Sequence, residues 1–145
     1  MLALFQTLAA LCCTWFAGAA VYINLVEHPA RMSCDTETAV AVWAPSYQRA
    51  TVMQATLAVT SFLTGLGAWL LGAGQGWLVA AVLIGLVVPY TFVAVMPVNR
   101  RLLAPGRDTA TGETRELLDR WAQLHAVRSA LGVAASVVYL TSLLG

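Results

Sequence analysis

The sequence has little charge and contains no lysine. Charged residues make up 10% of its 145 residues, and hydrophobic residues make up 59%. Soluble domains carry about 25% charged residues, so this chain lacks the polar surface that a soluble domain needs. We therefore expect residues 1–145 to form a single membrane domain. All eight basic residues are arginine, a composition that fits a GC-rich bacterial source and hence a bacterial inner membrane.

Several functional signatures are also missing. The net charge is only +1 and no basic stretch is long enough to follow a phosphate backbone, so nucleic acid is not an expected partner. The three cysteines, Cys12, Cys13 and Cys34, form neither a disulfide framework nor a CxxC pair. HExxH and Walker motifs are absent as well. Function must therefore be inferred from scattered polar residues.

Four apolar stretches are long enough to cross a bilayer, which takes about 20 residues. They cover residues 2–26, 46–72, 77–98 and 121–144. The first has no basic residue before it, so we expect a retained helix rather than a cleaved signal peptide. The simplest packing is an all-α, up-down-up-down four-helix bundle. We expect its close helix contacts at small residues, namely Gly18, Gly65, Gly85 and Gly132.

The three connections differ in length and polarity. Residues 72–76 form a short glycine-rich turn. Residues 32–45 predict a short surface helix capped by Asp35, after which Pro45 begins the second span. In residues 99–120 the chain breaks at Pro105 and becomes helical again from about Thr111.

Arginine placement predicts the orientation in the membrane. Seven of the eight arginines lie in or beside the two long connections, and none lies in the short turn or at the C-terminus. By the positive-inside rule, both long loops are expected in the cytoplasm.

Polar residues cluster where the spans approach these loops. The first span offers four residues at i, i+3, i+4 and i+7, which share one helical face: Asn24, Glu27, His28 and Arg31. The other spans add Tyr47, Thr51 and Gln54, then Met96 and Asn99, then Trp121, His125 and Arg128. We also expect Pro89 and Pro97 to kink the third span beside a cavity. These residues predict a polar pocket in the cytoplasmic half of the bundle.

Most of these residues also have an ordinary structural explanation as interface anchors, interhelical hydrogen bonds or packing: Arg31, Tyr47, Trp121, Thr51, Gln54, Asn99 and Met96. His125 and Arg128 are different, because they lie inside the fourth span. A charge there costs about 2.5–3.5 kcal/mol on insertion scales. Glu27 beside His28 is similar, since a carboxylate can serve as the partner of an imidazole.

The residues leave several chemistries open. An imidazole can remove a proton from a weakly acidic carbon or phenol, while an arginine stabilises the resulting oxyanion. Alternatively, His28, His125 and Glu27 would form a ligand set for iron, or the two histidines would bind copper or haem. A third possibility is a non-catalytic membrane subunit or a small transporter, which would require an oligomer.

Four runs of the sequence resemble the anthrone oxygenase-like family of small four-helix membrane proteins. These are GAAVYINLVEHPAR (18–31), WAPSYQRATVMQATLA (43–58), MPVNRRL (96–102) and RWAQLHAVRSALG (120–132). The resemblance implies oxidation of an anthrone to an anthraquinone with molecular oxygen in an aromatic polyketide pathway. It places His28, Asn99, Trp121, His125 and Arg128 in the pocket.

This resemblance suggests a mechanism with no required cofactor. One histidine would remove a proton, and Arg128 or Arg31 would stabilise the anion, which then reduces oxygen. Trp121, Tyr47 and Met96 would form an apolar wall for a flat ring. The expected partners are a lipophilic small molecule, molecular oxygen and membrane lipids, with a homo-oligomer as a further possibility.

Overall fold

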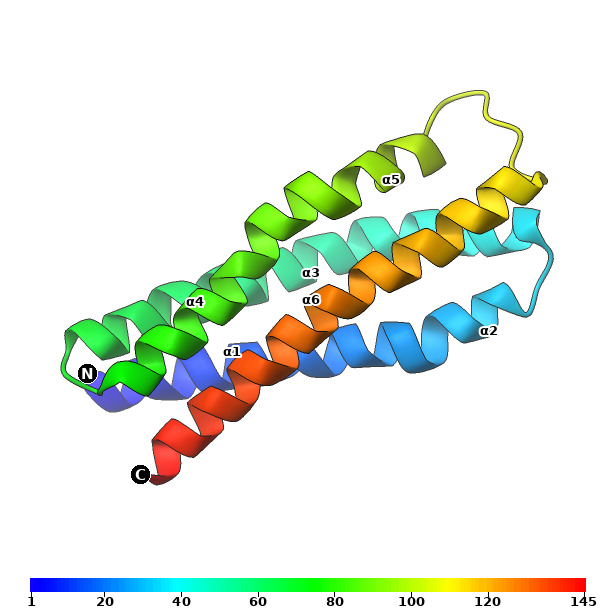
Figure 1. The fold of residues 1–145 in the computed structure, drawn as a ribbon. Helices are drawn as coiled ribbons and strands as arrows, with labels where there is room; N and C mark the ends of the chain where they lie inside the picture. The colour runs from blue at the N-terminus through cyan, green and yellow to red at the C-terminus, as the bar shows by residue number, and fades with distance from the viewer.

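The computed structural model describes residues 1–145 and contains four long helical rods without strands (Figure 1). The first rod joins α1 (Leu2–Tyr22), the π-helical segment η1 (Ile23–Glu27) and α2 (His28–Met32). The second is α3 (Thr36–Leu70). The third joins α4 (Gln75–Tyr90), the π-helical segment η2 (Thr91–Val95) and α5 (Met96–Leu102). The fourth is α6 (Gly112–Leu144).

The rods form the expected up-down-up-down bundle. α1 packs against α3 and α6, and α4 packs against the same two helices from the other side. Both termini and the α3–α4 turn lie at one end, and the two longer connections lie at the other (Figure 1). All four rods are long and apolar enough to cross a membrane. The predicted fold class is therefore confirmed.

Local sequence signals set several helix ends. The Asp35 side chain accepts a hydrogen bond from the Thr38 backbone N–H, and the Thr111 side chain accepts one from the Thr114 N–H. Both residues are therefore N-caps, as predicted for Asp35. Gly72 and Gly74 in the short turn have positive φ angles of 89° and 95°, which glycine adopts without steric cost.

The prediction for Pro45 was wrong. α3 runs without a break from Thr36, so residues 36–45 belong to the second rod instead of a separate surface helix, and Pro45 lies inside it. Pro45 is exposed and lies about two turns from the helix start. Its ring removes the hydrogen bond to the Ala41 carbonyl, which is also exposed. One unpaired carbonyl near the helix end costs less than ending the helix would.

The other prolines coincide with a change in helical winding. η1 ends two residues before Pro29, and η2 lies between Pro89 and Pro97. Since proline cannot donate a backbone hydrogen bond, the neighbouring turns rewind as π-helix. The predicted irregularity of the third rod is therefore a π-helical segment, and the first rod contains a second one.

The half of the bundle next to the termini is closely packed around small residues. A Cβ at Gly65 would lie 1.8 Å from the Tyr139 hydroxyl, and one at Gly132 would lie 2.7 Å from the Phe16 ring. Gly85 lies equally close to the Phe62 ring. These three glycines permit close helix contacts, as predicted. Gly18 does not, because it is exposed and has no neighbour within 4 Å.

Candidate functional site

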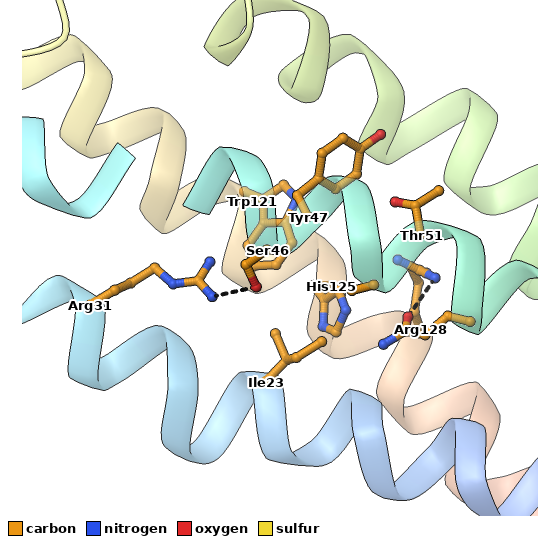
Figure 2. Close-up of a pocket in the computed structure, with 10 residues that line it drawn as sticks. Ile23, Arg31, Ser46, Tyr47, Thr51, Trp121, His125 and Arg128 are labelled. Atoms are coloured by element: carbon orange, nitrogen blue, oxygen red, sulfur yellow. Dashed lines mark hydrogen bonds between the residues drawn. The ribbon is translucent and has the colours of Figure 1, made fainter. Parts of the chain in front are cut away.

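The other half of the bundle contains a small polar cavity of about 10 Å³, room for roughly one water molecule. Its lining comes from the first rod, α3 and α6 (Figure 2). The lining residues are Ile23, Arg31, Ser46, Tyr47, Ala50, Thr51, Gln54, Trp121, His125 and Arg128. Most of them were predicted from the sequence.

The hydrogen bonds of Asn24 define the tautomer of His125. Asn24 Nδ2 donates to the Ala122 carbonyl at 3.0 Å, so Oδ1 is the atom that faces α6. This oxygen accepts a hydrogen bond from Ser129 Oγ at 2.6 Å and lies 2.7 Å from His125 Nδ1. Because Oδ1 has no hydrogen, His125 Nδ1 must be the donor. The neutral ring therefore carries its lone pair on Nε2, the atom available to the cavity.

Arg31 is already neutralised within the first rod. Its guanidinium forms an ion pair with Glu27, and Ser46 Oγ donates to the same Glu27 oxygen. Arg31 Nη2 also lies 3.5 Å from Ser46 Oγ (Figure 2). Arg31 therefore contributes a compensated charge at the loop side of the cavity.

Arg128 has no such carboxylate partner. Its Nη2 donates to Gln54 Oε1 at 3.0 Å, and the guanidinium carbon lies 5.8 Å from the centre of the Phe16 ring. Arg128 is only 8% exposed. The site thus contains a buried positive charge held by a neutral amide and an aromatic face, an arrangement suited to a single anionic group.

Trp121 lies against both histidines. Its ring centroid is 5.4 Å from that of His28 and 4.9 Å from that of His125. His125 lines the cavity, but His28 does not, and both His28 ring nitrogens are buried without a hydrogen-bond partner in the chain. Of the predicted pair, only His125 therefore lines this cavity, while His28 packs against the Trp121 ring.

Four other predicted residues also lie outside the lining of the polar cavity, and one of them, Asn24, reaches the site through its hydrogen bond to His125. The Glu27 carboxylate is engaged by Arg31 and Ser46, and Asn99 is buried with no hydrogen bond to its amide group. Met96 lines a neighbouring cavity instead. No three His, Cys, Asp or Glu side chains come together in a geometry suited to a metal ion. His28, His125 and Glu27 thus do not converge as the ligand set considered from the sequence.

The neighbouring inner cavity is larger and mostly apolar. Its volume is about 100 Å³, and it is lined mainly by α3, α4 and η2. Tyr47, Thr51, Gln54 and Arg128 line both cavities, so the inner cavity ends at the guanidinium. Phe16 contributes to its wall.

Sequence reasoning missed Phe16, Ser46 and Ser129. Ser129 follows His125 by one helical turn and Ser46 follows Pro45, so both lie near residues that were predicted. Hydroxyl residues are common in membrane helices, where they bond their own backbone. Phe16 lay within a uniformly apolar run, which gave no signal.

Comparison with known proteins gives a consistent family match. A sequence model of the anthrone oxygenases matches residues 43–138. The chain is 30% identical over 138 residues to the anthrone oxygenase gedH of Aspergillus terreus, covering 88% of this chain and 91% of that protein. It is 41% identical over 76 residues to the anthrone oxygenase tpcL of Aspergillus fumigatus, covering 50% and 47%.

An anthrone oxygenase of Claviceps purpurea is 31% identical over 78 residues, covering 48% of this chain and 45% of that protein. In the Aspergillus fumigatus and Claviceps purpurea proteins, the chain thus spans about half of the relative's length. No solved structure matches the chain. These relatives are fungal, so they do not support the bacterial membrane predicted from composition.

Proposed function

Since the chain belongs to the anthrone oxygenase family, we propose that it is a membrane-bound oxygenase of lipophilic aromatic compounds of the anthrone type. The observation that carries this proposal is the pairing of two groups in one cavity. His125 offers an unprotonated Nε2, and Arg128 offers a positive charge without a carboxylate partner. A base beside an unmatched cation suits a substrate that becomes a monoanion when it loses a proton.

The first step is removal of a proton. His125 Nε2 takes a proton from the acidic methylene carbon of the substrate, and the electron pair moves onto the ring carbonyl oxygen. Arg128 stabilises this phenolate-like oxygen most effectively in an environment with little water. Asn24 holds the imidazole through Nδ1 and stabilises it when it becomes charged.

The second step is oxidation of the anion by molecular oxygen. The carbanion transfers electrons to oxygen and forms a carbon–oxygen bond, and the product takes up a proton as a hydroperoxide. Loss of water from the hydroperoxide leaves a carbonyl group. One substrate molecule and one oxygen molecule thus give one quinone and one water, with no required cofactor.

The setting of this reaction is a membrane. We place both long loops in the cytoplasm, because they carry most of the arginines. The cavity then lies in the cytoplasmic half of the bilayer. Assignment to a bacterial inner membrane and assembly into a homo-oligomer stay predictions.

The proposal is tested by following anthrone oxidation in lipid nanodiscs. We expect equal amounts of oxygen consumed and anthraquinone formed, above the uncatalysed rate in empty nanodiscs. The His125→Ala variant should lose about 10²–10⁴-fold in rate, the usual contribution of a general base. Val127→Ala is the matched control on the same helix, because Val127 is exposed away from the cavity. A His125→Ala variant as fast as Val127→Ala would refute the proposal.

The alternative of an iron, copper or haem protein that uses His28 and His125 is tested separately. Elemental analysis and an absorption spectrum of protein purified without chelators would reveal stoichiometric metal. A non-catalytic subunit would instead show no oxygen uptake in any lipid and would co-purify with a partner.

A further inference from the structure

We propose that the substrate reaches this site sideways from the bilayer, through an apolar groove between α3 and α4. This inference rests on the proposed function and adds a route and a binding place to it. The route ends at Arg128, which the substrate approaches with its oxygen first.

The groove is an open depression in the lipid-facing surface, with a volume of about 420 Å³. α3 contributes Ala58, Val59 and Phe62, and α4 contributes Val82, Gly85, Leu86, Val88 and Pro89. A Cβ at Gly85 would lie 2.8 Å from the Phe62 ring, so this ring rests directly on the glycine. The groove therefore presents an aromatic ring among aliphatic side chains, a surface that suits a flat apolar molecule.

The groove adjoins the site through shared lining residues. It shares Ala58 and Val88 with the inner cavity, and the inner cavity shares Gln54 and Arg128 with the polar cavity. A molecule that moves inwards thus passes from an apolar surface to a cavity with one positive charge. This sequence of environments suits a molecule that has an aromatic ring system and a single acidic oxygen.

The wall of the inner cavity can change shape to accommodate a ligand. The inner cavity holds about 100 Å³, less than the ~300–1,000 Å³ of common ligand pockets. Thr91 and Phe92, which line it, belong to η2, and Met96 follows that segment. π-helical turns are irregular and methionine is flexible, so this wall can widen around a ligand.

A second groove, of about 650 Å³, lies on the loop half of α3 and shares Ser46 and Ala50 with the polar cavity, but its lining includes the charged Arg49 and suits a flat apolar molecule less well. Trp43, Leu118 and Trp121 belong to a buried cluster between the polar cavity and the loops. Arg115 donates to the carbonyls of Met32 and Cys34, which ties the first loop to α6. These contacts pack the first loop and α6 together at the end of the bundle next to the loops.

The occupant we propose is a flat lipophilic aromatic compound with an enolisable carbonyl group. Its rings fill the groove and the inner cavity, and its oxygen accepts hydrogen bonds from Arg128. A lipid acyl chain would fill the groove equally well but offers no oxygen to the guanidinium. The experiment must therefore distinguish passage of substrate from simple lipid packing.

The test is to narrow the groove and to measure kcat and KM for anthrone in nanodiscs. Val59→Trp and Val82→Trp place a large ring on opposite walls of the groove, at valines that are 45% and 46% exposed. We expect each to lower kcat/KM by about tenfold or more, a change of at least about 1.4 kcal/mol. Because the reacting groups are untouched, kcat at saturating substrate should change little.

Leu11→Trp is the matched control. Leu11 is 42% exposed and lines a groove of about 360 Å³ between α1 and α6, which shares no residue with the polar cavity. Its replacement should leave kcat/KM unchanged. Val59→Ala, which widens the α3–α4 groove, should keep or raise kcat/KM and shows that this position tolerates substitution.

The outcomes separate the two proposals. An active parent protein whose groove variants match Leu11→Trp refutes the lateral route and leaves the oxygenase proposal standing. An equal loss in all three tryptophan variants also refutes the route, because it indicates general lipid packing. A parent protein that oxidises no anthrone refutes the oxygenase proposal and, because the lateral route rests on that proposal, refutes the route as well.

Discussion

Buried polar atoms are mostly hydrogen-bonded in the half of the bundle next to the termini, whereas many of them lack a partner in the half next to the loops. Next to the termini, the Tyr139 hydroxyl donates to the Ser61 carbonyl at 3.2 Å, and Ser61 Oγ donates to the Ala9 carbonyl at 2.9 Å. Near the loops, several buried nitrogen and oxygen atoms have no partner in the chain. They belong to His28, Arg31, Trp43, Gln54, Asn99, Trp121 and Arg128.

This difference teaches which half carries stability and which carries chemistry. An unpaired buried polar group costs about 1–3 kcal/mol, so a bundle selected for stability alone would replace it. The terminal half has only the Trp77 indole among its unpaired atoms and packs its helices through glycines. The loop half retains its unpaired polar groups despite their energetic cost, and a ligand can form hydrogen bonds with them.

Among the variants considered, replacement of Arg128 should have the largest effect on the activity of the loop half. Arg128→Met keeps much of the side-chain volume but removes the positive charge from the cavity. We expect kcat for anthrone oxidation to fall by about 10²–10³-fold, the usual loss for one oxyanion-stabilising donor. Thermal unfolding should occur at the same or higher temperature, because a buried unmatched charge is gone. A fall in both activity and stability would show that Arg128 is a structural residue.

An alanine at Gly65 should have the opposite effect. Its Cβ would meet the Tyr139 hydroxyl at 1.8 Å, and overpacking of this kind costs about 1–3 kcal/mol. We expect a lower unfolding temperature and an unchanged kcat for the folded fraction. Gly18→Ala is the matched control, because nothing lies within 4 Å of that position. Equal unfolding temperatures for the two variants would contradict the assignment of tight packing.

Asn24 contributes both to the contact between the first rod and α6 and to the orientation of His125. Asn24→Leu removes the acceptor of His125 Nδ1, so the imidazole no longer has one enforced tautomer. We expect a loss of about tenfold in rate, which corresponds to the 0.5–1.5 kcal/mol of one hydrogen bond. ¹⁵N NMR of labelled histidine should show a protonated Nδ1 in the parent and a mixture in Asn24→Leu. Asn24→Asp, which keeps an acceptor, should restore the parent pattern; a protonated Nε2 in the parent protein would refute the assignment.

Asp35 should give the smallest effect, on stability alone. The backbone N–H and the hydroxyl of Thr38 donate to this carboxylate and hold the pKa of Asp35 below its usual value. A lowered folded-state pKa stabilises the protein above the unfolded pKa, and this contribution is lost as the pH falls through the folded pKa. Asp35→Asn keeps a cap but cannot ionise. Its unfolding temperature should match the parent in acid and lie slightly below it at neutral pH, with unchanged oxidation rate.

The sequence predicted the helices well because hydropathy and capping are local. Four spans, the caps Asp35 and Thr111 and the glycine turn follow from residues close together in the chain. The prediction for Pro45 was wrong because a single missing hydrogen bond does not end a helix that continues on both sides of it.

The candidate site was predicted less completely, because it depends on how each helix is rotated. Spacing placed Asn24 and His28 on one face, yet η1 changes the winding between them. Both residues still face α6, where Asn24 meets His125 and His28 packs against Trp121. A π-helical turn has no clear sequence signature beyond a nearby proline, so this change of winding could not be predicted.

The isolated charge of Arg128 also bears on the biosynthesis of the protein. α6 leaves the ribosome after α1 and α3, and alone it would carry this charge into lipid at a cost of about 2.5–3.5 kcal/mol. By then α1 and α3 are already made, and they supply the Phe16 ring and the Gln54 amide that receive the guanidinium. The order of synthesis therefore means that both partners of Arg128 are already present when α6 enters the membrane.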